Sequence, residues 1–575
     1  MIETKGTQIY IARRWLLLGI YMLGMVALLW RAVDLQILNK DFLQEHGDAR
    51  ALRVVDIPAH RGMIIDRNGE PLAVSTPVSS IWATPRKVIM SAMALSPLAS
   101  LLDMTAVELE VMLNDRIGRD FIYLKRRVNP ELAEKVMALD IPGISLQREF
   151  RRYYPAGEVI SHVIGFTNID DTGQEGLELA YNDWLKGVPG SKRVLKDRLG
   201  RIIENIESIT EPDPGKTLQL SIDRRIQYLA YRELKAAVNL HHAHGGSLVL
   251  LDAKTGEIIA MVGQPSYNPN NRSGLKSEYY RNRAITDTFE PGSTLKPFTI
   301  AAALESGLYT PETSIDTRPG YIKVGEHTIR DARNFGVIDV ATVIKKSSNV
   351  GASKIALSLE PSNLWEILSS VGFGHPTSSG FPGESGGRLN TYNSWSEVEL
   401  ATISFGYGLS VTALQLAQAY MILAADGKLL PLSFHKISAP VEGTRVLSEK
   451  VARQVRIMLE TVVQKGGTGK RATIDGYRVA GKTGTVHKFT IGGYSEDRYI
   501  SLFAGIAPAS DPRLVMVVVI DEPGGKQYYG GQVAAPIFSK VMSGALRLLN
   551  ITPDNLPALT NKIVAGTGIK GERSK

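Results

Sequence analysis

The feature that most constrains this chain lies close to its N-terminus. Residues 15–30 form an uncharged, apolar run of 16, with Trp15 and Trp30 at its two ends. A spanning helix needs about 20 apolar residues, and interfacial tryptophans mark the ends of such helices. Arg13 and Arg14 precede the run, and positive charge favours the cytoplasmic side. We therefore expect a single-pass anchor at residues 15–32 in the cytoplasmic membrane. Residues 1–14 would be a cytoplasmic tail, and the rest of the chain would lie outside that membrane.

Two other interpretations of this run are weaker. A cleaved signal peptide would end in small residues at alternate positions, whereas Arg31, Ala32, Val33 and Asp34 follow here. A buried core helix does not explain the flanking arginines and tryptophans. No later stretch is long enough to span a membrane.

The composition is that of a folded protein with several domains. The chain has 575 residues, more than one core usually supports, with 44% hydrophobic and 22% charged residues. It has no cysteine, which excludes thiol catalysis, zinc–thiolate sites and disulfides. The net charge of +8 gives a slightly basic surface, but we find no nucleic-acid-binding motif and expect no nucleic-acid partner.

Turn-forming residues divide the rest of the chain into two parts. Between the anchor and the Pro- and Gly-rich segment 211–215 we expect a module at residues 33–215, with helical structure at 86–140 and a helix at 175–187. Residues 216–550 would form an α+β domain on an antiparallel sheet. Its expected elements are a strand at 217–222, a helix at 224–238, a hairpin at 246–262, two strands at 504–522 and a helix at 536–549. We expect residues 551–575 to be disordered.

Ser293 and Lys296 form the first candidate catalytic pair. They open an apolar helix and lie three residues apart, so their side chains share one face. The start of a helix also stabilises a developing anion. A neutral Lys296, with its pKa lowered by burial or by a neighbouring cation, could take the proton of Ser293. Alone, such a pair is common by chance and would be interpreted as a plain surface pair.

Two further motifs follow in order. Ser347 and Asn349 lie 54 and 56 residues after Ser293. A serine can relay a proton to a leaving amine, and an asparagine can bind a substrate amide, although a helix cap is the simpler interpretation of each alone. Lys482, Thr483, Gly484 and Thr485 follow on a predicted strand.

This last motif combines a cation, two hydroxyls for a carboxylate and a glycine that lets a substrate backbone pair with the strand edge. A second Lys-Thr-Gly sequence at 254–256 shows the alternative, because there we predict a simple hairpin turn.

The three motifs together resemble the penicillin-interacting serine acyl-transferases. Segments 60–75 and 148–187 are similar to the non-catalytic module of class B penicillin-binding proteins, and segments 405–420 and 504–523 to their transpeptidase domain. The similarity is to the septal, pseudomonad-type enzymes of Gram-negative bacteria. Thr483 departs from that type, which has serine there, so a paralogue of the division enzyme stays open.

The resemblance implies a peptidoglycan D,D-transpeptidase that needs no cofactor and no metal. Ser293 would attack the stem peptide, Lys296 would take its proton, and Ser347 and Lys482 would protonate the leaving D-alanine. The backbone N–H groups of Ser293 and Thr485 would form the oxyanion hole. Asn349, Thr483, Gly484 and Thr485 would hold the donor peptide, and the cleft would be lined by Tyr407, Phe503, Tyr528 and Tyr529.

The implied partners are peptidoglycan stem peptides, β-lactam antibiotics, the inner membrane, a lipid-II polymerase of the FtsW type and other division proteins. A D,D-carboxypeptidase stays open as an alternative, since the residues themselves do not choose between an amine and water. A serine β-lactamase is weaker, because no Glu-x-x-x-Asn segment lies between Asn349 and Lys482. A membrane-bound β-lactam sensor would need a cytoplasmic signalling domain, and the few residues before the anchor are too short to form one.

Overall fold

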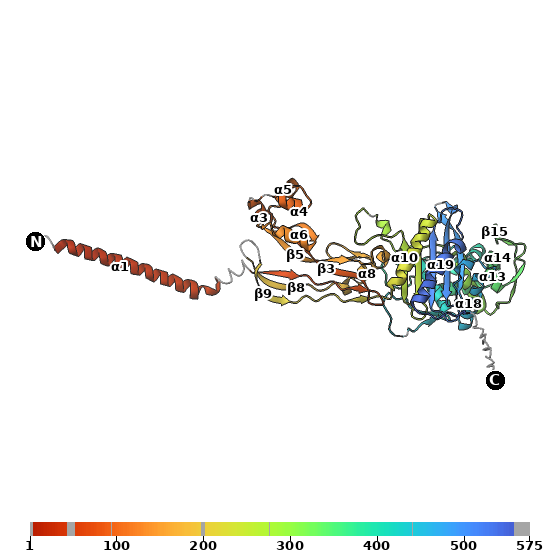
Figure 1. Ribbon diagram of the computed structural model, residues 1–575. Helices are drawn as coiled ribbons and strands as arrows, with labels where there is room; N and C mark the ends of the chain where they lie inside the picture. Colours follow the sequence, from red (N-terminus) through yellow and green to blue (C-terminus); the bar gives the residue numbers. More distant parts are fainter. Residues whose placement is uncertain are drawn as a thin grey trace, which may run out of the picture. The chain divides into compact units, whose positions relative to one another are not determined.

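The N-terminal helix is long, apolar and exposed. In the computed structural model, which describes residues 4–42, 52–91, 93, 95–196, 202–274, 276–439, 441–490 and 492–556, α1 spans Thr4–Val33 and a π-helical turn follows at Asp34–Leu38 (Figure 1). Thirty residues give a helix of about 45 Å, enough to cross a bilayer. Leu23 is 76% exposed, and no other described segment is both long and apolar enough to span a membrane. The structure thus supplies a single candidate span within the described part of the chain.

The contacts of the chain separate it into two compact units. The first comprises Met1–Arg61, Ser75–Arg151 and Lys186–Gly215. It contains a three-stranded antiparallel sheet of β1 (Leu52–Ile57), β8 (Gly190–Lys196) and β9 (Ile202–Thr210), in the order β1-β8-β9. The C-terminal part of β3 (Pro71–Ala83) pairs with β4 (Ile122–Val128), and β5 (Ile144–Tyr153) also pairs with β3.

One secondary-structure prediction for this unit was partly wrong. Residues 86–140 are helical only in α3 (Pro85–Met90), α4 (Ser96–Leu101), α5 (Ala106–Asn114) and α6 (Pro130–Met137), and β4 interrupts them. The segment has few turn-forming residues, which made it look helical, but Ile122, Leu124 and Val128 alternate into the core beside β3. Pairing with β3 therefore outweighs the helical propensity of its charged residues.

The second unit, which comprises Gly62–Val74, Arg152–Leu185 and Lys216–Lys575, is built on a five-stranded antiparallel sheet. The strand order is β12-β11-β21-β20-β19. The strands are β11 (Gly245–Asp252), β12 (Ile258–Gln264), β19 (Ala480–Thr490), β20 (Gly493–Ala507) and β21 (Leu514–Asp521). The predicted α+β fold with an antiparallel sheet is confirmed, and β19, which carries the Lys-Thr-Gly motif, is an edge strand.

Helices cover both faces of this sheet. On one face, α10 (Arg224–Leu240) and α19 (Gly530–Leu548) lie side by side (Figure 1). The other face packs against α17 (Ala413–Ala424), and α12 (Lys296–Glu305) belongs to the same hydrophobic core. The predicted helix at 224–238 and hairpin at 246–262 are confirmed, whereas the last helix begins at Gly530 and the expected helix at 175–187 is divided into two short helices.

The remaining elements of the second unit are short or flank the sheet. They are β2 (Ile64–Ile65), α7 (Ser161–Ile164), β6 (Phe166–Thr167), β7 (Gly173–Glu175), α8 (Gly176–Ala180), α9 (Asn182–Leu185), β10 (Leu218–Gln219), α11 (Arg283–Thr286), β13 (Ser314–Asp316), β14 (Tyr321–Val324), β15 (His327–Arg330), β16 (Val337–Asp339), α13 (Val340–Lys346), α14 (Asn349–Leu357), α15 (Pro361–Ser370), α16 (Glu397–Ile403), β17 (Lys428–Leu429), β18 (Thr444–Arg445) and α18 (Glu449–Val463). Five 3₁₀ turns join them: η2 (Gly157–Val159), η3 (Ser277–Tyr279), η4 (Gly292–Leu295), η5 (Tyr392–Ser394) and η6 (Lys470–Ala472).

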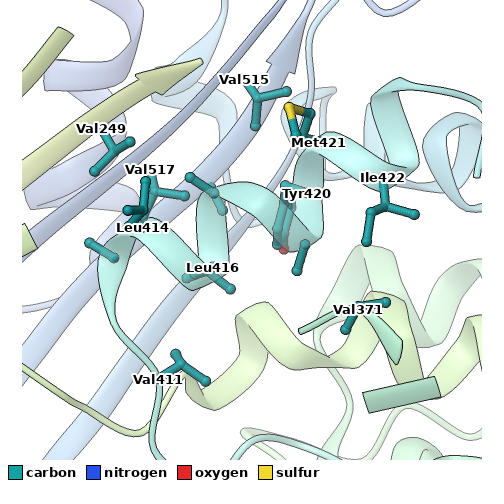
Figure 2. Close-up of a cluster of buried hydrophobic side chains, with 14 of the residues drawn as sticks. Val249, Val371, Val411, Leu414, Leu416, Tyr420, Met421, Ile422, Val515 and Val517 are labelled. Carbon is teal, nitrogen blue, oxygen red and sulfur yellow. The ribbon is translucent and has the colours of Figure 1, made fainter. Parts of the chain in front are cut away.

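Helix α17 is the centre of the core beneath the candidate site. All twelve of its residues are buried, and Leu414, Leu416 and Met421 lie among side chains from the sheet such as Val249 and Val517 (Figure 2). Each fully buried aliphatic side chain stabilises the fold by about 1.5–3 kcal/mol. The helix is therefore a rigid support for whatever rests on it. Most of the predicted disordered tail, residues 557–575, lies outside the described residues.

Candidate active site

Ser293 lies in η4, the 3₁₀ turn that leads directly into α12. Gly292 has a φ of +52°, and a Cβ there would lie 2.4 Å from Cγ2 of Val486, so only glycine fits. From beneath, the hydroxyl of Tyr420 on α17 donates to the carbonyl of Thr294 at 2.9 Å. The turn is thus fixed between the buried helix and strand β19. This places the candidate nucleophile one turn before α12.

Lys296 is fully buried and lies at the centre of the site. Its Nζ is 3.1 Å from Oγ of Ser293, 2.7 Å from Oδ1 of Asn349 and 2.6 Å from the carbonyl oxygen of Ser347. Burial lowers the pKa of Lys296 well below its ordinary value, and the charge of Lys482 lowers it further. A neutral amine 3.1 Å from a serine hydroxyl can act as its base.

Ser347 connects the two lysines. Its hydroxyl lies 3.2 Å from Nζ of Lys296 and 2.9 Å from Nζ of Lys482. It ends α13 in the left-handed conformation, with φ of 60°, which is unusual for a residue other than glycine. Burial lowers the pKa of Lys482 to about 7. The structure therefore brings Ser293, Lys296, Ser347 and Lys482 into one continuous chain of hydrogen-bonding groups.

Asp331 holds this arrangement, and no sequence motif marks this residue. Its carboxylate accepts from the hydroxyl of Ser348 at 2.6 Å and from the backbone N–H groups of Asn349 and Val350 at 2.5 and 3.0 Å. It therefore caps the start of α14, a position that favours negative charge. Its charge also opposes the lowering of the pKa of Lys296. A lone aspartate after β15 carries no motif, so only the fold identifies it.

The Lys-Thr-Gly-Thr segment forms the open edge of the sheet. A Cβ at Gly484 would lie 3.0 Å from Leu502 and 3.1 Å from Cγ2 of Thr294, so this glycine lets β19 approach the nucleophile turn. Oγ1 of Thr485 accepts from the backbone N–H of Gly530 at 2.9 Å, and Oγ1 of Thr483 pairs with a neighbouring threonine hydroxyl at 2.8 Å. The second Lys-Thr-Gly sequence, at 254–256, lies in the turn between β11 and β12, as predicted.

Comparison with known proteins identifies the family. Residues 246–543 match the family described as the penicillin binding protein transpeptidase domain, and residues 56–220 match the penicillin-binding protein dimerisation domain. The chain is 46% identical to the peptidoglycan D,D-transpeptidase FtsI of Escherichia coli K12 over 94% of this chain and 92% of that protein. The chain is a class B penicillin-binding protein.

Other relatives and solved structures agree with this family. The chain is 44% identical to the Probable peptidoglycan D,D-transpeptidase PbpC of Pseudomonas aeruginosa, over 95% of this chain and 97% of that protein. The transpeptidase domain of penicillin-binding protein 3 from Burkholderia pseudomallei is 42% identical, with a TM-score of 0.55 over 59% of this chain and 98% of that chain. Penicillin-binding protein 3 of Mycobacterium tuberculosis, solved with aztreonam, is 28% identical, with a TM-score of 0.68 over 88% of this chain and 98% of that one.

The aromatic residues that were expected to line the cleft of this penicillin-binding protein fall into two groups. The expectation for one residue, Phe503, was wrong. Phe503 is fully buried and packs 4.7 Å from Phe538 of α19, between the sheet and the helix, so it does not line the cleft. Tyr499, one residue before β20 becomes continuously buried, was missed: its ring stacks 4.1 Å from that of Tyr528. Tyr529 continues this group, 4.5 Å from Tyr528.

Tyr407 lies apart from those three rings. It is half-buried, and its ring meets that of Tyr494 edge-on at 5.5 Å. The hydroxyl of Tyr494 donates to Oε1 of Glu290 at 2.9 Å, and the backbone N–H of Gly408 donates to the same oxygen at 2.8 Å. Burial raises the pKa of Glu290. The aromatic residues near the site thus form one group around Tyr528 and another around Glu290.

Proposed function

We propose that this class B penicillin-binding protein is a peptidoglycan D,D-transpeptidase that crosslinks stem peptides during septal cell-wall synthesis. The observation that carries the proposal is the position of Lys296: a buried amine that contacts Ser293, Ser347 and Asn349 at once. The names of the relatives, which include peptidoglycan D,D-transpeptidases, support the same activity.

In the first half of the reaction, Oγ of Ser293 attacks the carbonyl carbon of the penultimate D-alanine. Lys296, neutral because of its burial, takes the hydroxyl proton as the new ester bond forms. The backbone N–H groups of Ser293 and Thr485 stabilise the oxyanion. Both groups belong to segments that pack together, since Gly292 lies against Val486.

The leaving D-alanine needs a proton on its amine before the C–N bond breaks. The hydroxyl of Ser347 donates it and regains a proton from Lys482 or Lys296, both of which lie within 3.2 Å of that oxygen. A pKa of about 7 lets Lys482 exist in both protonation states near neutral pH. This chain of groups returns the proton taken from Ser293 to the leaving group.

The donor peptide pairs with the outer edge of β19. Asn349 binds a donor amide, and the hydroxyls of Thr483 and Thr485 bind the terminal carboxylate. Tyr407, Tyr528 and Tyr529 line the ends of this groove. An amine from a neighbouring stem peptide then attacks the ester and forms the crosslink. A β-lactam acylates Ser293 in the same way and blocks the site.

The competing activity is D,D-carboxypeptidase, in which water resolves the ester. The test incubates the full-length protein in detergent with a thioester mimic of the stem peptide, with and without a D-amino acid acceptor, and follows the products by mass spectrometry. We expect the acceptor to appear in the product in proportion to its concentration. Hydrolysis alone at every acceptor concentration would show that the enzyme is a carboxypeptidase.

The location of the protein follows from the same reaction. We propose that α1 anchors the chain with its N-terminus in the cytoplasm and residues 33–550 in the periplasm, where the substrate is. Residues 33–215 would be the non-catalytic module and 216–550 the transpeptidase domain. A lipid-II polymerase of the FtsW type would supply new strands. Concentration of a tagged protein at midcell would distinguish the division enzyme from a paralogue.

A further inference from the structure

A cavity opens in the first unit, where residues of β4, β5 and the start of α6 meet. It has a volume of about 460 Å³, within the range of about 300–1,000 Å³ that is usual for ligand pockets. Its wall carries five cationic side chains and two carboxylates. The cations are Lys125, Arg126, Arg127, Lys135 and Arg151. None of the steps of the proposed reaction uses this cavity.

A β-bulge gathers three of these cations. The pairing of β3 with β4 shifts register between Ser79 and Ile81, where β4 carries one residue more than β3. Arg127 takes the left-handed conformation there, with φ of 58°. A regular strand sends neighbouring side chains to opposite faces, whereas the bulge lets Lys125, Arg126 and Arg127 line the same cavity. Bulges that turn side chains in this way are common beside binding and active sites.

Arg151 offers an open cation to a ligand. Its side chain is exposed, and no carboxylate of the described residues pairs with its guanidinium. Arg126, by contrast, is held by Glu149, whose carboxylate oxygen lies 3.1 Å from a guanidinium nitrogen. Because a guanidinium can donate two parallel hydrogen bonds to one carboxylate, Arg151 is suited to bind a ligand of that kind.

The two lysines of the wall hold carboxylates that are themselves exposed. Nζ of Lys125 lies 2.5 Å from a carboxylate oxygen of Asp103, whose side chain is 85% exposed. Nζ of Lys135 lies 2.7 Å from one of Glu131, whose side chain is 73% exposed. Exposed ion pairs add little stability, so a ligand can exchange with them at small cost. The cavity therefore suits a ligand that carries both carboxylates and an amine.

The proposed function supplies a ligand with these groups. A stem peptide ends in a carboxylate and carries the amine that acts as acceptor. Leu101, Val128 and Leu132 complete the wall with apolar surface, which suits the methyl groups of alanine residues. An inorganic anion would gain nothing from the apolar surface and would be repelled by the two carboxylates.

We propose that this cavity binds uncrosslinked stem peptides of the peptidoglycan strand, as a second site in addition to the one at Ser293. The inference rests on the proposed function, since it takes the substrate to be peptidoglycan. A strand carries many stem peptides, so binding one of them in the first unit raises the effective concentration of the others for the second unit.

The test measures binding of a fluorescent stem pentapeptide, with a free side-chain amine and a C-terminal D-alanyl-D-alanine, to the full-length protein in detergent. The protein is first acylated with penicillin, so that Ser293 neither binds nor consumes the probe. We expect saturable binding by fluorescence anisotropy. Amidation of the C-terminal carboxylate should weaken it by at least about fivefold, because a charged hydrogen bond is lost. No saturable binding to the acylated protein would overturn the inference.

Arg151→Gln removes the charge of an exposed side chain that makes no ion pair with the described residues, so the fold is kept. We expect the Kd for the pentapeptide to rise by at least about fivefold. Arg148→Gln is the matched control, because Arg148 is an exposed arginine of the same strand β5 that does not line the cavity. Equal Kd values for the two variants would contradict the assignment.

A hexaglutamate peptide tests the rival class of occupant, an acidic segment of a partner protein. We expect it to displace the probe only at concentrations at least about tenfold above those of unlabelled pentapeptide, since it has no amine for Asp103 or Glu131. Displacement at equal or lower concentration would assign the cavity to an acidic protein segment and overturn the inference.

Failure of this inference and failure of the proposed function give different results. A protein that transfers the thioester donor to the acceptor but, once acylated, does not bind the pentapeptide would overturn the second site alone. A protein that binds the pentapeptide through Arg151 but only hydrolyses the thioester would overturn the proposed transpeptidase activity and leave the second site in place.

Discussion

Two buried lysines approach the same hydroxyl group, that of Ser347, at 3.2 and 2.9 Å. Burial lowers the pKa of both lysines, and the charge of Lys482 lowers the pKa of Lys296 further. The result is a site in which a proton can pass between neighbouring groups without water. Function here requires charges in places where they reduce stability.

The cost of burying Lys482 predicts how the free energy of unfolding depends on pH. Lys482 has a pKa of about 7 in the folded protein and about 10.4 when unfolded. Between these values the unfolded chain holds a proton that the native chain has lost, so the free energy of unfolding rises with pH in this window, by up to about 1.4 kcal/mol per unit. We expect a Lys482→Met protein to lose this rise when apparent Tm is followed from pH 7 to 10. Parallel curves for the two proteins would contradict the low pKa.

Asp331 gives a second prediction at this scale. Asp331→Ala leaves the hydroxyl of Ser348 and two backbone N–H groups without their acceptor, at a cost of about 2 kcal/mol in folding stability. Because Asn349 then moves relative to Lys296, we expect the rate of acylation by a fluorescent penicillin to fall by at least about tenfold. Asp331→Asn, which keeps one oxygen for the N–H groups, should fall less. An unchanged rate in Asp331→Ala would exclude a positioning role.

At the scale of elements, the site forms where the edge strand β19, the turn η4 and the end of α13 meet. Sequence spacing predicted the motifs on these elements because each is local: Ser293 and Lys296 are three residues apart, and Lys482 to Thr485 are consecutive. Asp331 was not predictable, because it reaches Asn349 only through the fold.

The error at Phe503 has the same physical origin. Tyr499 and Phe503 lie on one strand, and nothing in the sequence marks where that strand passes from the cleft into the core. The structure places the change at Ile500, after which β20 is buried throughout. Long-range packing therefore decides which aromatic residue of this strand is buried in the core.

Gly484 tests the close approach of these elements. A methyl group there would press against Leu502 and Thr294, and overpacking of this kind costs about 1–3 kcal/mol. We expect Gly484→Ala to separate β19 from the nucleophile turn and to slow penicillin acylation by at least about tenfold. Gly118→Ala, where a Cβ meets nothing within 4 Å, is the control. Equal acylation rates for the two variants would contradict the packing account.

At the scale of the whole molecule, the chain combines an exposed apolar helix with a catalytic unit that has its own core. By its length and its exposed leucines and tryptophans, α1 is a candidate membrane span. The sequence predicted this helix and the α+β fold, because both depend on local periodicity. It also predicted the motifs, because each is a short run of neighbouring residues. It did not predict β4, which depends on pairing with β3.

A truncated protein tests this division of roles. We expect removal of residues 1–38 to move the protein from the membrane fraction to the soluble fraction on cell fractionation, while penicillin acylation stays within about twofold of the full-length rate, because the residues of the site all lie in the second unit. Loss of acylation in a soluble, folded protein would show that the anchor also supports the active site.

The central claim, that Ser293 forms the acyl-enzyme with Lys296 as its base, is tested most directly by intact-mass spectrometry after exposure to a penicillin. The native protein should gain the mass of one penicillin molecule, located at Ser293 by peptide mapping. Ser293→Ala should gain none, and Lys296→Met, which keeps the nucleophile, should react at least about 100-fold more slowly. A penicillin adduct on Ser293→Ala, or a normal rate in Lys296→Met, would contradict the account.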